Sequence, residues 1–236
     1  MPRFLTQKLR TFTLSILLHG TASILFIPLL VTPASSYAEE TEGVRQLLTH
    51  EQLKSILPEN TRLLDDAEGI ELFLDAIDGT PPNWPEVYGN DGAGHDERLF
   101  ALNRERDRLR GGHDGLTSRL MFLWAGELST YDFERGGFHV AIGPKVIPTR
   151  WGLVRFKPED LPPNLVAVPP PTLNESLQRR VRNGERIEID VALTGRLIPD
   201  ESIIYDFAHE EPGQGMVMPV VRIEKIDYVL SRVRTY

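Results

Sequence analysis

After Leu116, the apolar residues of the chain follow the short period of extended strands. Apolar runs at residues 120–124, 138–142 and 151–156 predict three strands, separated by glycine and proline. Between residues 187 and 193, apolar side chains alternate with polar ones, which predicts a fourth strand with one buried face. A fifth strand is expected near the end of the chain.

The fifth strand changes phase in its middle. Val221 and Ile223 fall on odd positions, whereas Ile226 and Tyr228 fall on even ones. A β-bulge inserts one extra residue and so restores the direction of the side chains that follow it. We therefore expect a bulge at Glu224–Lys225, with Ile223 and Ile226 both pointing into the core.

Before residue 115 the pattern is helical. A capping box, Thr49 with Gln52, predicts a short helix, and a second box opens a helix near Asp65. The second helix is expected to end at Gly79, and a third is expected from His95 to Arg110. The spacing of one helical face predicts the buried residues of the second helix as Ile70, Phe73, Leu74 and Ile77.

The order of these elements predicts an α+β fold. A proline-rich crossing at residues 158–171 follows the third strand, and Thr172 with Glu175 then opens a helix before the last two strands. Three strands, a helix and two strands is the order of an oligonucleotide/oligosaccharide-binding (OB) barrel. We expect a helical N-terminal region, residues 39–114, and a small, mostly antiparallel OB-like β-barrel, residues 115–236. The alternative is an open antiparallel α+β sheet.

The first 38 residues are typical of a secretory signal peptide. Arg3, Lys8 and Arg10 precede an uncharged apolar run from Phe12 to Val31, and small residues at Ser36 and Ala38 suit a cleavage site. We expect cleavage after Ala38 and a periplasmic or secreted protein. A retained membrane anchor is the competing interpretation, because the apolar run is long enough to span a bilayer.

The net charge and the absence of cysteine exclude or disfavour several classes of function. Residues 39–236 contain 23 Lys and Arg against 34 Asp and Glu, a net charge of −11, so a general nucleic-acid partner is disfavoured. The chain has no cysteine, which excludes thiol chemistry, cysteine zinc sites and stabilisation by disulfides.

Two Gly-His-Asp triplets, at His95-Asp96 and His113-Asp114, bring together residue types that bind metals. They lie at opposite ends of the predicted third helix, about 25 Å apart, so we interpret them as helix-end residues. The acidic connection from Pro199 to Gly215, which contains His209-Glu210-Glu211, is interpreted as solvated. We predict no metal site and no cofactor.

Carboxylates between the first two strands, at Glu127, Asp132 and Glu134, could form the acid and base pair of a carbohydrate hydrolase. Carboxylates are plentiful in this chain, so such a grouping also arises by chance. A carbohydrate hydrolase and a metal-binding protein therefore stay alternatives to a non-enzymatic function.

The region from Arg135 to Lys157 is the most basic part of the predicted mature chain and is also rich in aromatic residues. Because OB barrels use their second and third strands for ligands, we expect any ligand to bind here. Tyr131 and Phe133 could extend this aromatic platform, although core packing explains such residues equally well. The candidate ligand-binding residues are Arg135, Phe138, Lys145, Arg150, Trp151 and Arg155.

No motif in the chain specifies a reaction. The sequence therefore favours an exported, non-enzymatic binding or assembly module whose partner is an envelope protein or peptide. We expect no stable membrane span after cleavage, and the sequence leaves the oligomeric state open.

Overall fold

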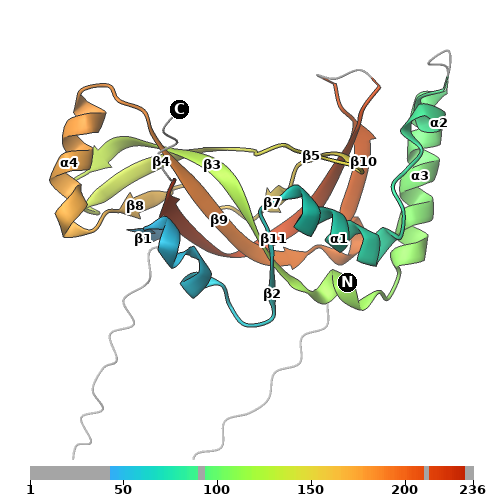
Figure 1. Ribbon diagram of the computed structural model, residues 1–236, viewed down its shortest axis with the longest axis horizontal. Coiled ribbons are helices and arrows are strands. Elements are labelled where there is room, and N and C mark those ends of the chain that lie inside the picture. Colours follow the sequence, from blue (N-terminus) through green and yellow to red (C-terminus); the bar gives the residue numbers. More distant parts are fainter. Residues whose placement is uncertain (1–42, 90–93, 210–212, 232–236) are drawn as a thin grey trace, which may run out of the picture. The chain divides into compact units, whose positions relative to one another are not determined.

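Three long strands form the centre of the fold, with β9 antiparallel to both of its neighbours, β3 and β11 (Figure 1). The computed structural model describes residues 43–89, 94–209 and 213–231, so the predicted signal peptide lies outside the described residues. The described residues belong to one compact unit. The three central strands are β3 (Arg119–Asp132), β9 (Ile187–Leu197) and β11 (Gly215–Leu230).

At one end, three shorter strands close the central strands into a six-stranded mixed barrel in the order β3, β4, β8, β1, β11 and β9. β1 is parallel to both of its neighbours, and the other pairs in the ring are antiparallel. This confirms an α+β fold that contains a barrel. The closing strands are β1 (Val44–Leu48), β4 (Gly137–Gly143) and β8 (Val166–Val168).

Beyond the barrel, β3 and β11 continue into an open sheet. β2 adds to β3, and β6, β7 and β10 add to β11, with β5 pairing on β6. These strands are β2 (Thr61–Leu64), β5 (Ile147–Thr149), β6 (Gly152–Val154), β7 (Lys157–Glu159) and β10 (Ile203–Phe207).

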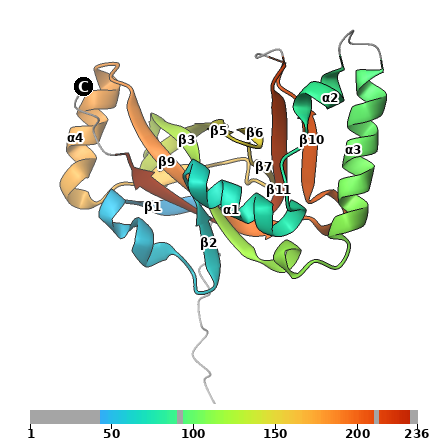
Figure 2. The same cartoon turned by 45° about the vertical axis from the view of Figure 1, so that its right-hand side comes forward.

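The helices lie at both ends of the sheet: α4 beside the barrel, and α1, α2 and α3 beside the open sheet (Figures 1 and 2). Among the described residues, none of the helices is long and apolar enough to cross a bilayer. The α-helices are α1 (Ala67–Asp78), α2 (Trp84–Tyr88), α3 (His95–Arg110) and α4 (Pro171–Arg182). The 3₁₀-helices are η1 (His50–Ile56), η2 (Asp114–Thr117) and η3 (Pro199–Glu201).

Most of the predicted helix signals are confirmed, but the box of Thr172 with Glu175 was wrong, because α4 begins at Pro171 after Pro170 and has no side-chain cap. The N-cap of α1 is Asp66, one residue after the predicted Asp65, and its side chain accepts a hydrogen bond from the Gly69 amide at 2.8 Å. The four predicted core residues of α1 are all buried. Gly79 ends the helix with a positive φ of 76°. α3 has the predicted bounds, and Gln52 accepts from the Thr49 amide at 2.8 Å.

The predicted bulge is also confirmed. The register of β11 against β9 shifts between Ile223 and Lys225, so Val221, Ile226 and Tyr228 all belong to one core cluster, with Ile223 packed against it. The inserted Glu224 accepts hydrogen bonds from Arg119 and Arg196 at 2.9 and 2.8 Å.

Side chains fill the barrel. Phe122, Phe138 and Leu193 are fully buried in one core cluster, to which Leu177 of α4 also belongs. The buried Tyr228 hydroxyl donates to the Gly43 carbonyl at 2.7 Å, which fixes the start of β1. Position 43 requires glycine, because its φ is 89° and a Cβ atom there would lie 2.4 Å from the Asn164 carbonyl oxygen.

The prediction of the third barrel strand was wrong. Residues 151–156 contribute only the three-residue β6, which lies in the open sheet, and the third strand of the barrel in chain order after β3 and β4 is β8. β8 lies inside the proline-rich crossing, where three residues, Val166–Val168, pair with both β4 and β1. So short a strand leaves no alternating pattern to detect.

The region before residue 115 contains two strands that the sequence did not predict, beside its helices. β1 and β2 lie within it, and β1 completes the barrel. The acidic connection after β9 likewise contains a strand that the sequence did not predict, β10, which forms a hairpin with the first residues of β11.

Candidate functional site

The six predicted ligand-binding residues do not form one surface. Arg135 and Phe138 belong to the hairpin that joins β3 to β4, whereas Trp151 and Arg155 adjoin β6 in the open sheet. β6 pairs with the first residues of β11, while the hairpin lies at the barrel end, beyond the residues of β3 that pair with the start of β9. Lys145 lies half-buried on the connection between these two regions.

Trp151 is a core residue. It is fully buried, its indole Nε1 donates to Asp75 Oδ1 at 3.1 Å, and its carbonyl accepts from Trp84 Nε1 at 2.8 Å. Arg150 binds the same helix, because its amide donates to Glu71 at 2.8 Å and its guanidinium pairs with Glu71 and Asp75. Arg150 and Trp151 thus hold the β5–β6 turn on α1, and Trp151 presents no ring to solvent.

Phe138 is also fully buried, inside the barrel. Arg155 is half-buried, its amide donates to the Val217 carbonyl at 3.0 Å, and its Nη2 lies 3.7 Å from Met218 Sδ. Of the six residues, only Arg135 therefore lies on a surface that also carries an exposed aromatic ring. Whether any of the six binds a ligand stays a prediction.

The hairpin between β3 and β4 has a rigid tip. The carboxylate of Asp132 accepts hydrogen bonds from the Glu134 and Arg135 amides at 2.9 and 3.1 Å and from Arg135 Nη1 at 2.6 Å. These bonds, that of the Arg135 side chain first, lower the pKa of Asp132. Gly136, with a φ of 66°, allows the chain to turn back into β4.

This tip holds the Phe133 ring in solvent, where the residue is 84% exposed. Phe133 packs edge-on against Tyr131, with the ring centroids 5.1 Å apart, and Tyr131 packs edge-on against the buried Phe138 at 4.9 Å. The Tyr131 hydroxyl accepts from Asn174 Nδ2 of α4 at 3.2 Å. A chain of three rings thus links an exposed phenyl group to the barrel core. We call Tyr131, Phe133, Arg135 and the half-exposed His139 the hairpin surface.

The hairpin and the acidic connection after β9 lie far apart along the central strands. Arg119 at the start of β3 pairs with Arg196 near the end of β9, whereas Leu128 pairs with Ile187 at its start. The hairpin and the acidic connection therefore lie at opposite ends of the central strands.

The hydrolase alternative gains no support from the carboxylates near the hairpin. Glu127 is paired with Arg186, whose Nη2 donates to Glu127 Oε2 at 2.8 Å. A glycosidase acid needs a raised pKa in order to hold its proton, whereas the pKa of Asp132 is lowered.

The two Gly-His-Asp triplets take helix-end roles. His113 Nδ1 accepts from the Gly115 amide at 3.0 Å and caps η2, while His95 pairs with Asp96 at 3.2 Å and packs edge-on against Phe207. No three metal-ligating side chains within the described ranges lie close enough together to hold an ion. His209 is exposed, and Glu210 and Glu211 lie outside those ranges.

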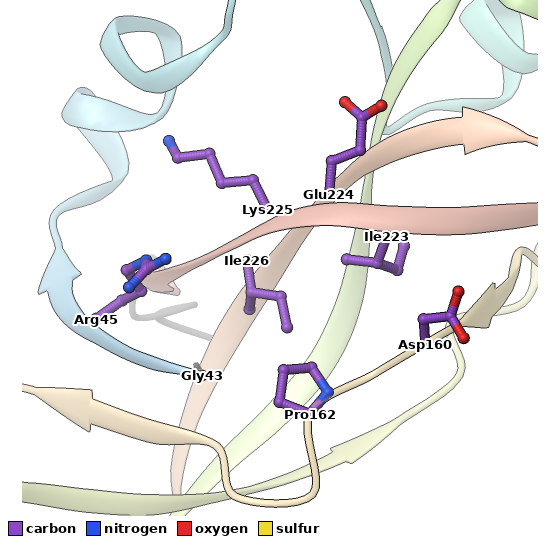
Figure 3. Close-up of a pocket in the computed structure, with 8 residues that line it drawn as sticks. All are labelled: Gly43, Arg45, Asp160, Pro162, Ile223, Glu224, Lys225 and Ile226. Atoms are coloured by element: carbon purple, nitrogen blue, oxygen red, sulfur yellow. The ribbon is translucent and has the colours of Figure 1, made fainter. Parts of the chain in front are cut away.

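A small pocket of about 50 Å³ opens beside the bulge, between β11 and the connection to β8 (Figure 3). Its apolar wall comes from Pro162, Ile223 and Ile226. The charged residues at its rim already have partners within the protein, since Glu224 binds two arginines and Lys225 pairs with Asp227 at 2.9 Å. The pocket has room for little more than one aliphatic side chain.

A buried ionic cluster joins α1, α3 and β10, and no local pattern in the sequence indicates it. Arg110, 1% exposed, donates from Nε and Nη2 to the two carboxylate oxygens of Asp78, at 2.6 and 2.8 Å. The Tyr205 hydroxyl also donates to Asp78, and Asn103 of α3 exchanges two hydrogen bonds with the Tyr205 backbone. The asparagine therefore covers the free edge of β10, as a further strand would.

Comparison of the chain with protein families, with curated proteins and with solved structures found no match.

Proposed function

We propose that this protein is an exported, non-enzymatic binding module of the cell envelope whose hairpin surface contacts a protein partner. The observation that carries the proposal is the exposed Phe133 ring on a hydrogen-bonded tip. Aromatic and arginine side chains dominate binding energy at protein interfaces, and Phe133 and Arg135 supply one of each. Because the tip is already ordered, little conformational entropy is lost when a partner covers the ring.

Export is part of the proposal and depends on residues 1–38, which have the pattern of a signal peptide. The net charge of −11 over residues 39–236 favours neutral or cationic partners over nucleic acid. The filled barrel interior also favours contact at a surface over uptake of a ligand into the barrel.

We also propose that the barrel is a modified OB-like barrel. Along the chain, β3, β4 and β8 precede α4, and β9 and β11 follow it. In this interpretation β1 is an additional strand inserted between β8 and β11. OB barrels bind ligands through the loop between their first two strands, and the β3–β4 hairpin occupies that position.

Photo-crosslinking tests the binding proposal. A photoreactive phenylalanine analogue replaces Phe133 in the full-length chain, which is expressed in its native cells and irradiated. The matched control carries the analogue at Phe100, another exposed phenylalanine, which lies on α3 at the other end of the sheet. We expect a discrete protein adduct from position 133 that is absent from position 100.

Two results would contradict the proposal. One is the absence of any protein adduct from position 133 while the variant is folded and exported. The other is the same set of adducts from both positions, because such a set reflects exposure rather than a specific interface.

A further inference from the structure

A second cavity, of about 200 Å³, lies at the C-terminal end of α3, far from the hairpin surface. It is lined by the last turn of the helix, by the glycine pair after it, by one residue each of η2 and η3, and by the residue that follows η3. Figure 2 shows this end of α3 beside β10. The lining residues are Asp107, Arg110, Gly111, Gly112, Leu116, Pro199 and Ser202.

The positive charge in this cavity is already compensated. Arg110 donates from Nε and Nη2 to Asp78, and from Nη1 to Asp107 Oδ1 at 2.8 Å and to the Ile203 carbonyl at 2.9 Å. All three guanidinium nitrogens therefore have acceptors within the protein. Four of the five N–H groups are used in this way, so a carboxylate or a phosphate could accept at most one further hydrogen bond from Arg110.

Hydrogen-bond acceptors, by contrast, remain available. Ser202 is 2% exposed, yet its hydroxyl has no hydrogen-bond partner among the residues that the structure describes. The Asp107 side chain is 50% exposed, and one of its two carboxylate oxygens accepts a hydrogen bond from Arg110. Ser202 lines the cavity, so its hydroxyl can accept a hydrogen bond from a ligand there.

The end of α3 adds further acceptors. Gly79 and Gly89 cap the ends of α1 and α2 by donating their amides back to the helix, whereas Gly111 makes no such bond in the described part of the chain. The Arg110 carbonyl accepts from the His113 amide at 2.8 Å, whereas the carbonyls before it in the last turn carry a partial negative charge that favours cations. The wall of the cavity formed by Leu116 and Pro199 is apolar.

We infer that this cavity binds a protonated primary amine on a short aliphatic chain. The ammonium group has three donors and no acceptor, which matches the Asp107 carboxylate, the Ser202 hydroxyl and the carbonyls at the end of α3. The methylene groups lie against Leu116 and Pro199. The amine is either a free small molecule or the side chain of a lysine. This site is independent of the hairpin surface.

Calorimetric titration of the full-length protein with n-butylamine tests the inference. We expect saturable binding that weakens at least tenfold in Asp107→Asn, because the variant loses the charge but retains an oxygen for Arg110. Ser202→Ala should weaken binding severalfold through loss of one acceptor. The control is Asp96→Asn. The Asp96 side chain is 89% exposed and lies in the first turn of the same helix, so loss of its carboxylate should leave the affinity unchanged.

Three results would overturn the inference: no saturable binding of n-butylamine, equal binding by the wild type and both cavity variants, or preferential binding of butyrate. Should Asp107→Asn not fold, Ser202→Ala alone decides. A parallel titration with Nα-acetyl-lysine methylamide distinguishes the two sources of the amine. Binding of both probes indicates a site open to lysine side chains, and binding of n-butylamine alone indicates a site for a free amine.

Discussion

Arg110→Met should destabilise this protein strongly. The side chains of Arg110 and Asp78 are 2% and 1% exposed, so the substitution leaves the Asp78 carboxylate buried without its counter-charge. Loss of one partner of such a pair costs about 3–5 kcal/mol. The Ile203 carbonyl also loses a donor. Small domains are stable by only about 5–15 kcal/mol, so this change removes a large part of the total.

Urea unfolding followed by circular dichroism measures the loss. The control is Arg108→Met, because Arg108 pairs with Glu105 on the exposed face of the same helix, with side chains 67% and 55% exposed. Exposed pairs contribute little, and we expect the control to unfold at the wild-type midpoint. Adding Asp78→Asn to Arg110→Met should recover part of the stability, since no uncompensated charge then remains. Equal midpoints for both single variants, or further loss in the double variant, would refute the reasoning.

Three further predictions concern the core. Burial raises the pKa of Tyr205 and of Tyr228, so above pH of about 10 the unfolded chain releases protons that the folded chain retains. Urea midpoints should therefore fall as the pH rises above about 10, and tyrosinate absorbance should show both residues protonated until unfolding; early ionisation of both would contradict this. Trp151→Ala should cost roughly 3–5 kcal/mol in urea unfolding, whereas Arg150→Ala, at a half-exposed side chain, should cost less; equal losses would contradict the core assignment. Deletion of Glu224 should abolish the near-ultraviolet dichroism of the folded protein, because it turns the remaining side chains of β11 to the other face, whereas Glu224→Ala should keep it; a well-folded deletion variant would disprove the role of the bulge.

Local sequence patterns were enough to predict an element when the pattern extended over the whole element. α1 has an N-cap, a four-residue apolar face and a C-terminal glycine, and the structure places its ends within two residues of the prediction. The bulge at Glu224 was visible because β11 is long enough to show both phases of its apolar pattern.

Elements stabilised by distant partners could not be found in this way. β8 is three residues between prolines and becomes a strand because β4 and β1 pair with it on both sides. β10 lies in a stretch whose acidic residues suggest a solvated loop. It is a strand because β11 pairs with one of its edges and Asn103 of α3 bonds to the other. Trp151 looked like a surface ligand residue because nothing near it in the sequence shows that α1 packs over it.

The candidate site also depends on contacts between residues that are distant in the sequence. The sequence placed binding in the region from Arg135 to Lys157, but the sheet divides that region between its two ends. The exposed Phe133 is distinguished from its buried neighbour Phe138 only by its place at the tip of a hairpin. The partners of Arg110 lie on α1 and β10, far from it along the chain, and no local pattern pairs them.

The most direct test of the proposed binding role is the affinity of the purified protein for the partner identified by crosslinking at position 133. Phe133→Ala should weaken that affinity at least tenfold, because burial of an aromatic anchor at an interface contributes about 2 kcal/mol or more. Phe100→Ala should leave the affinity unchanged, and both variants should unfold at the wild-type midpoint, since both side chains are mostly exposed. Equal affinities for Phe133→Ala and the wild type would contradict the assignment of the hairpin surface as the binding site.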